Sequence, residues 1–183
     1  MSLLKSFLLG AVTLVAILAI ISICLPSRIH IQRDIVIHAP AEDTYRQISE
    51  VRNWTNWLPW HLNEPEMEVT YSGPPGGAGA QYRWVSKSSE EKAGAVTIVA
   101  AEPNKRVVTN LELRENDIAS GTFTLEPIPE GTKLTWYLDK YTGNNLISKF
   151  SGLLVDSTVG EDIEKGLENL KKEVESRQVL SEE

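Results

Sequence analysis

Six consecutive segments between residues 67 and 141 show the alternation of apolar and polar residues that predicts half-buried β-strands. Turn-forming stretches such as GPPGGAG at 73–79 and PIPEGT at 127–132 separate them. The predicted strands cover residues 67–72, 80–86, 93–101, 107–114, 118–125 and 133–141. Because the connections are short, we expect neighbouring strands to pair in antiparallel fashion. The pattern therefore predicts an antiparallel meander.

A further strand and a helix precede the meander. The strand is predicted from four isoleucines at alternate positions, namely Ile29, Ile31, Ile35 and Ile37. Pro40, followed by two acidic residues, is typical of the first turn of a helix, and we expect about ten helical residues after it. The tryptophan-rich stretch RNWTNWLPW at 52–60 follows this helix and is expected to form a helical turn.

A long helix is predicted at the end of the chain, over residues 146–176. Its apolar stripe consists of Ile163, Leu167, Leu170 and Val174, which share one helical face. We therefore predict an α+β fold in which a curved, seven-stranded antiparallel sheet wraps around one long C-terminal helix. A strongly curved sheet of this kind can leave a cavity between sheet and helix.

The N-terminus carries an apolar run from Ser6 to Leu25 without a charged residue. A helix of that length spans about 30 Å, the thickness of the hydrocarbon core of a bilayer. The alternative is a cleaved signal peptide, but its apolar region would be about 7–15 residues and a small-x-small cleavage site would follow. We therefore predict a transmembrane anchor over residues 1–27, a folded domain over 28–177 and a disordered tail over 178–183.

Charge and cysteine content limit the partners of the domain. The chain has a formal net charge of −7, and Lys5 alone among the basic residues precedes the apolar run. The part after the run is therefore acidic as well, and we expect no nucleic-acid partner. The short segment before the run favours a cytoplasmic N-terminus, which places the domain on the periplasmic side of a bacterial inner membrane. The single cysteine, Cys24, lies within the run and leaves no disulfide possible within one chain.

Five motifs in order resemble a known superfamily. They are IVIHAPAEDTY, WTNWLPW, YSGPPGGAGAQYRW, GTKLTW and DIEKGLENLK, which together extend over most of residues 29–176. They resemble the SRPBCC superfamily, relatives of START and Bet v 1 domains, and within it the polyketide cyclase/dehydrase-type branch. The resemblance implies a helix-grip fold around a deep apolar cavity that binds lipids, sterols, polyketides or other hydrophobic molecules. A minority of such proteins catalyse cyclisation or dehydration.

The three tryptophans at 54, 57 and 60 allow three interpretations: a membrane-interface belt, plain core packing, or the wall of a ligand cavity. Trp54 and Trp57 are expected to be structural, whereas Pro59 should redirect Trp60 toward the cavity. The glycine-rich stretch at 73–79 is expected to be a hairpin turn with positive-φ positions rather than a phosphate-binding loop. His61, Glu64 and Glu66 are expected to be solvated loop residues.

Alternation assigns the inward-facing residues that could bind a ligand. The candidates are Trp60, Tyr82, Trp84, Leu111, Leu113, Phe123, Trp136, Leu138, Phe150 and Leu154. No His or Cys spacing indicates a metal, and no cofactor is predicted. The sequence thus predicts a membrane-anchored, non-catalytic binding domain for a hydrophobic small molecule or lipid. The alternatives are a cyclase or dehydratase-like enzyme, with Tyr82 or His61 as polar participant, and a protein-interaction module whose cavity is filled.

Overall fold

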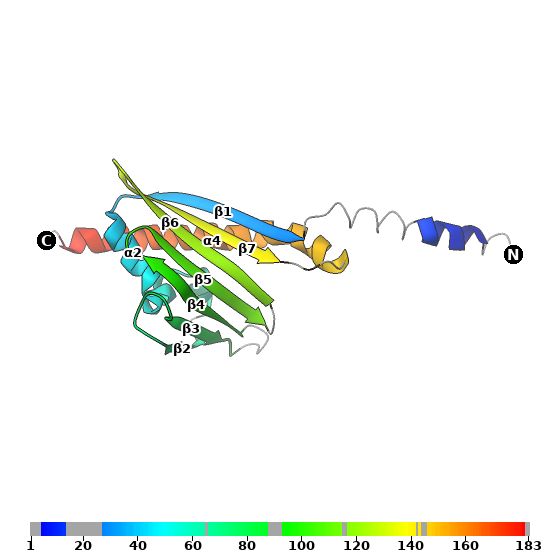
Figure 1. Ribbon diagram of the computed structural model, residues 1–183, viewed down its shortest axis with the longest axis horizontal. Helices are drawn as coiled ribbons and strands as arrows, with labels where there is room; N and C mark the ends of the chain where they lie inside the picture. The colour runs from blue at the N-terminus through cyan, green and yellow to red at the C-terminus, as the bar shows by residue number, and fades with distance from the viewer. Residues whose placement is uncertain are drawn as a thin grey trace.

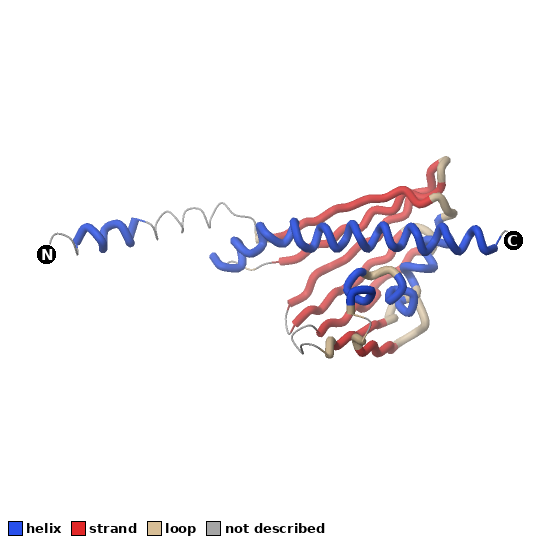
Figure 2. Tube along the Cα trace, turned by 180° about the vertical axis from the view of Figure 1, so that it is seen from behind, coloured by secondary structure: helices blue, strands red, loops and turns tan. Residues whose placement is uncertain are grey.

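The structure is a computed structural model that describes residues 5–13, 27–64, 66–87, 93–114, 117–141, 143 and 146–181. Seven strands form one antiparallel sheet, and the helices that follow β1 lie on one of its faces (Figures 1 and 2). The strands are β1 (Arg28–Ile37), β2 (Glu68–Ser72), β3 (Gln81–Val85), β4 (Ala93–Glu102), β5 (Arg106–Arg114), β6 (Asp117–Ile128) and β7 (Gly131–Tyr141). The helices of the domain are α2 (Ala41–Ser49), the 3-10 helix η1 (Val51–Asn56), α3 (Pro59–Asn63) and α4 (Leu146–Ser181).

The strand order is β1-β7-β6-β5-β4-β3-β2, so the six later strands form the predicted meander. The first strand pairs with the last, with Ile31 opposite Leu138 and Ile35 opposite Leu134. This pairing joins segments about a hundred residues apart in sequence. The predicted helix-grip arrangement of a curved seven-stranded antiparallel sheet and a long C-terminal helix is confirmed.

The core lies between the concave face of the sheet and α4. The apolar stripe of α4 is buried as predicted, with Ile163, Leu167, Leu170 and Val174 each at most 2% exposed. Arg33, on the same face of β1, reaches Glu164 of α4 through an Nε–Oε1 contact of 2.6 Å. Just after β1, Glu175 of α4 accepts a hydrogen bond from the backbone N–H of His38 at 2.8 Å and lies 2.9 Å from its ring Nδ1. Polar contacts thus join α4 to the middle of β1 and to the residue that follows the strand.

The glycine-rich turn between β2 and β3 has the positive φ angles predicted for it, at Gly73, Gly77 and Gly79. Its backbone is bound at two places. Gly77 donates its N–H to Ser49 at the end of α2 at 2.9 Å, and Gly79 donates to Ile98 of β4 at 2.8 Å. The turn therefore connects the helical layer to the middle of the sheet.

The two ends of the chain differ in what the structure describes. Residues 5–13 form a helix, and residues 1–4 and 14–26 of the predicted anchor lie outside the described residues. Among the helices that the structure does describe, none combines the length and apolar character needed to cross a bilayer. At the C-terminus α4 continues to Ser181, five residues past its predicted end and into the segment expected to be a tail.

Candidate functional site

The concave face of the sheet carries a cluster of aromatic rings, which we call the aromatic interior. It consists of Trp54, Trp57, Trp60, His61, Tyr82, Trp84, Phe123 and Trp136. Trp54 lies on η1, Trp57 directly after it, and Trp60 and His61 on α3, while strands β3, β6 and β7 contribute the others. Neighbouring ring centroids are 4.7–6.3 Å apart within the cluster, the range of favourable aromatic pairs.

Sheet register explains how the strand residues meet. Tyr82 lies opposite Val96, which lies opposite Leu111, so these residues form one row across the concave face. Phe123 and Trp136 face each other between β6 and β7, with ring centroids 4.7 Å apart. Side chains that point to one face recur at every second residue, which is why the alternation in sequence identified this row.

Two glycines make room for the indole rings. A Cβ atom on Gly94 would lie 2.4 Å from Trp84 Cζ2 and 2.9 Å from the carbonyl oxygen of Glu112, so the ring of Trp84 lies directly against the β4 backbone. On α4, a Cβ atom on Gly166 would meet Trp136 at 3.4 Å, an ordinary contact distance. The sheet side of the interior is therefore packed more tightly than the helix side.

Trp54 and Trp57 are structural, as predicted. They are 2% and 0% exposed, and the Nε1 of Trp54 donates a 2.9 Å hydrogen bond to the carbonyl of Ile48. Asn169 of α4 donates through Nδ2 to the carbonyl of Trp57 at 3.2 Å, which fixes the tryptophan segment to the long helix. Plain core packing therefore accounts for Trp54 and for the ring of Trp57, whose Nε1 is left without a partner among the described residues.

Among the residues that the structure describes, five polar atoms of the aromatic interior are buried without a hydrogen-bond partner. They are Trp57 Nε1, Trp60 Nε1, His61 Nε2, Tyr82 Oη and Trp136 Nε1. Each such group costs about 1–3 kcal/mol when it stays unpaired, and buried polar groups in native proteins are usually satisfied by protein, water or a ligand. Four of them lie in tryptophan or tyrosine side chains, which offer N–H or O–H donors. This concentration of unpaired donors is the most unusual feature of the site.

His61 corrects the expectation that it is a solvated loop residue. It lies on α3, is 7% exposed, and its ring packs edge-on against Tyr82 with centroids 5.2 Å apart. Burial lowers the pKa of His61 to about 4, so the imidazole is neutral at pH 7. Glu64, just after α3, accepts a 3.2 Å hydrogen bond from Ser86, while Glu66 is exposed as predicted.

The predicted ligand-binding residues fall into three groups. Tyr82, Trp84, Phe123, Trp136 and Leu138 are buried on the concave face. Trp60 and Leu111 are partly buried and pack against the same core. The side chains of Leu113, Phe150 and Leu154 lie outside the described residues.

The pockets lined wholly by described residues include two that involve no predicted ligand-binding residue. One, of about 120 Å³, lies between α2 and α4, and the other, of about 80 Å³, adjoins the glycine-rich turn. Within the described ranges, no group of His, Cys, Asp and Glu side chains is arranged to hold a metal ion. Sequence reasoning missed the pocket between the helices, because its residues are scattered polar positions on two distant helices.

The fold and the aromatic interior together define a helix-grip protein. The chain belongs to the family described as polyketide cyclase / dehydrase and lipid transport, whose pattern matches residues 28–175. No curated protein matches the sequence.

Solved structures with the same fold include a protein from Chromobacterium violaceum, 18% identical with a TM-score of 0.56, over 80% of this chain and 98% of that one. A protein of unknown function from Staphylococcus aureus is 12% identical with a TM-score of 0.60, over 82% of this chain and 96% of that one. The di-domain ARO/CYC StfQ of the steffimycin biosynthetic pathway is 13% identical with a TM-score of 0.61, over 82% of this chain and 52% of that one. At such low identities these similarities describe the fold alone.

Proposed function

We propose that this protein binds a hydrophobic small molecule or lipid in the aromatic interior, without performing chemistry on it. The observation that carries the proposal is the set of five unpaired polar atoms among aromatic rings. An apolar ligand that carries oxygen atoms would accept hydrogen bonds from the indole N–H groups and the Tyr82 hydroxyl. The surrounding rings would supply the large apolar contact area that such ligands need.

Trp60 would lie at the entrance through which a ligand reaches the aromatic interior. It belongs to the short helix α3, is only partly buried, and contacts Trp84 with ring centroids 6.3 Å apart. Its Nε1 is nevertheless buried and unpaired. A movement of α3 would expose the Nε1 atom of Trp60 and the ring of His61 together, because both side chains are on this helix.

The apolar run at residues 6–25 would anchor the domain to a membrane, with the domain on the periplasmic side of a bacterial inner membrane. Apolar molecules partition into bilayers, so an anchor would keep the binding site close to its ligand. The proposed division of the chain is therefore an anchor over residues 1–27 and a binding domain over 28–177.

Native mass spectrometry of the full-length, detergent-solubilised protein, with extraction and identification of bound lipids, tests this function. We expect one apolar species to co-purify reproducibly with the native chain and to be depleted in Trp60→Ala. Trp54→Phe serves as a matched control, because it changes a tryptophan whose N–H is already bonded within the protein. Absence of any bound species, together with no thermal shift from a panel of lipids and polyketides, would leave a protein-interaction module as the better function.

A cyclase or dehydratase-like activity is the second candidate, and one observation favours it. The neutral imidazole of His61 packs beside the Tyr82 ring, and both carry an unpaired polar atom. A neutral histidine can accept a proton and a phenol can donate one, which are the roles that an acid–base dehydration needs. Conversion of the co-purified ligand by the native protein and not by His61→Leu would support this candidate over simple binding.

A further inference from the structure

The pocket of about 120 Å³ between α2 and α4 is separate from the aromatic interior. Its wall consists of Asp43, Arg46, Gln47, Val174, Arg177 and Gln178. At about 30 Å³ per molecule in the liquid, this volume equals that of about four waters, so it suits a small solute. Val174, which is 1% exposed, supplies an apolar floor.

Gln47 is the buried polar group of this wall. The residue is 4% exposed, and its side-chain Oε1 is buried with no hydrogen-bond partner in the part of the chain that the structure describes. Thr44, one helical turn earlier, likewise leaves a buried Oγ1 unpaired. Because a buried acceptor without a donor costs about 1–3 kcal/mol, this seam favours a guest that can donate a hydrogen bond to Gln47.

Arg46 can donate hydrogen bonds to a bound molecule, whereas Gln47 Oε1 can accept one. Its Nη2 atom lies 3.4 Å from Asp43 and 3.8 Å from Glu42, whereas charge-assisted hydrogen bonds are about 2.7–2.9 Å long. Its guanidinium group is therefore held only loosely by these carboxylates, and the Arg46 side chain is 52% exposed. Such a group remains able to bind an oxyanion.

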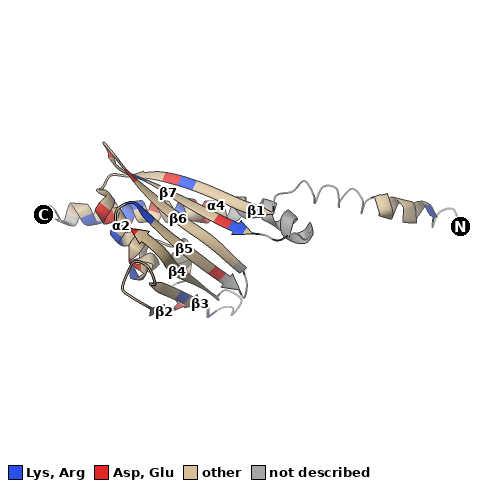
Figure 3. Ribbon diagram, viewed as in Figure 1, with Lys and Arg blue, Asp and Glu red and all other residues tan. Residues whose placement is uncertain are grey.

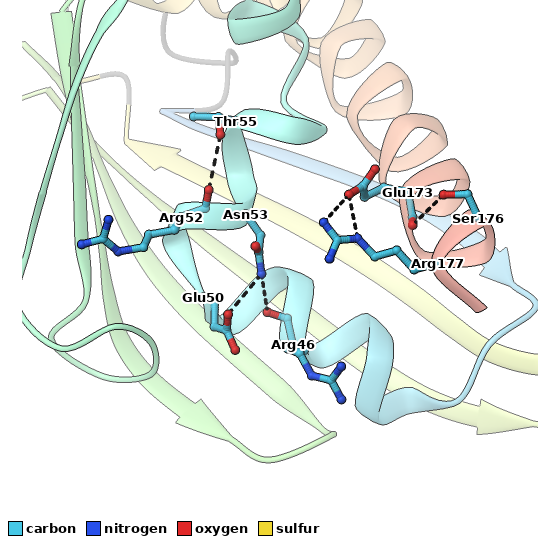
Figure 4. A network of polar contacts seen from close by, with 8 residues as sticks. All are labelled: Arg46, Glu50, Arg52, Asn53, Thr55, Glu173, Ser176 and Arg177. Carbon is cyan, nitrogen blue, oxygen red and sulfur yellow. Dashed lines mark hydrogen bonds and ion pairs between the residues drawn. The ribbon is translucent and has the colours of Figure 1, made fainter. Parts of the chain in front are cut away.

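The other charged groups at the seam are already engaged. Arg177 contacts Glu173 at 2.8 Å through Nε and at 2.7 Å through Nη2, and Figure 4 shows this pair on α4 facing the α2 side of the seam. Asp43 accepts a 3.2 Å hydrogen bond from Gln178. Charges of both signs are interspersed on these helices (Figure 3): the wall has two guanidinium groups and one carboxylate, and Glu42 and Glu173 lie beside them. The capacity to bind an anion therefore rests on the loosely held Arg46 and not on the net charge of the seam.

We propose that the seam between α2 and α4 binds a small oxyanion that also carries a hydroxyl group. The oxyanion would accept hydrogen bonds from Arg46, and its hydroxyl would donate to Gln47 Oε1. Hydrogen phosphate and a short 2-hydroxycarboxylate share this chemistry and both fit the volume. Such a ligand would join the first helix of the domain to the end of the long helix.

Thermal unfolding of the full-length, detergent-solubilised protein tests the site with two matched pairs of probes at equal ionic strength. Phosphate is compared with sulfate, which lacks the hydroxyl at neutral pH, and glycolate is compared with acetate. We expect a saturable rise in Tm for the hydroxyl-bearing member of at least one pair and a smaller rise for its partner. The pair that shows the difference identifies the ligand as a phosphate or as a hydroxy acid.

Two variants and a control decide whether the effect arises at this pocket. Gln47→Leu keeps the volume but removes the acceptor, so the difference within each pair should disappear. Arg46→Gln should reduce the Tm rise from either hydroxyl-bearing probe at least several-fold, while Arg52→Gln, whose guanidinium lies over the Tyr71 ring 4.8 Å from its centroid, should leave it unchanged. Equal stabilisation within both pairs, or a difference that persists in Gln47→Leu, would overturn the proposal.

Discussion

Substituting phenylalanine for Tyr82 should stabilise the ligand-free protein. Tyr82 is fully buried, and its hydroxyl has no hydrogen-bond partner within the protein. Tyr82→Phe keeps the ring, including its stacking on Trp84 at 5.1 Å, and removes only the unpaired group. Because an unpaired buried group costs about 1–3 kcal/mol, we expect a gain of about 1–2 kcal/mol in the free energy of unfolding. For a chain of this size that is a rise of about 2–8 °C in Tm.

Thermal and urea unfolding of the delipidated, full-length protein would measure this change. Tyr137→Phe is the matched control, because Tyr137 is only partly buried on the opposite face of the sheet and should change stability by less than about 0.5 kcal/mol. With the co-purifying ligand present the sign should reverse, since the variant cannot donate to it. A clear loss of stability in the ligand-free variant would show that the hydroxyl is satisfied in the native protein, and the reasoning from unpaired donors would fail.

Three further predictions concern pH and packing. The pKa of His61 is about 6.5 in the unfolded chain and about 4 in the folded protein. The free energy of unfolding should therefore be unaffected by His61 above pH 6.5 and fall by about 3 kcal/mol as the pH drops to 4. In His61→Leu, the free energy from urea unfolding should depend less on pH in that window. Burial raises the pKa of Glu175, but hydrogen bonds from His38 and the charge of Lys171 lower it overall. Glu175→Gln should therefore have a lower free energy of unfolding than the native protein above pH 4.5, and this difference should shrink as the pH falls below 4.5. Gly94→Ala should destabilise by about 1–3 kcal/mol through overpacking against Trp84, measured by urea unfolding. Gly166→Ala is its control, with ordinary contacts and a gain of up to about 1 kcal/mol from helix propensity.

The strands and the long helix could be predicted because their signals are local. Side-chain alternation along β3 placed Tyr82 and Trp84 on the concave face, and the four-three-four spacing on α4 identified its buried stripe. The pairing of β1 with β7 could not be predicted in this way. It depends on the curvature of the whole sheet, which brings Ile31 next to Leu138.

The polar members of the candidate sites were harder to predict. The neighbours of His61 along the chain include Asn63 and Glu64, which indicate a solvated loop, and its burial results from the packing of α3 on Tyr82. Gln47 and Arg46 gave no sequence signal, because their partners across the pocket are on α4, some 130 residues away. The unpaired polar atoms of the folded protein could not be predicted, because the sequence pattern does not show which side chains lack a hydrogen-bond partner.

The glycine-rich turn has a consequence for where the chain can change in length. Its composition suggests a permissive surface loop, the usual place for inserted tags and for evolutionary insertions. Here the N–H groups of Gly77 and Gly79 bind Ser49 and Ile98, and a Cβ on Gly76 would lie 2.8 Å from the Ser49 carbonyl oxygen. An insertion would shift these groups out of register with both the helix and the strand. Epitopes and fusion partners are therefore better placed elsewhere, and we expect the number of residues in this turn to be fixed more strictly than their identity.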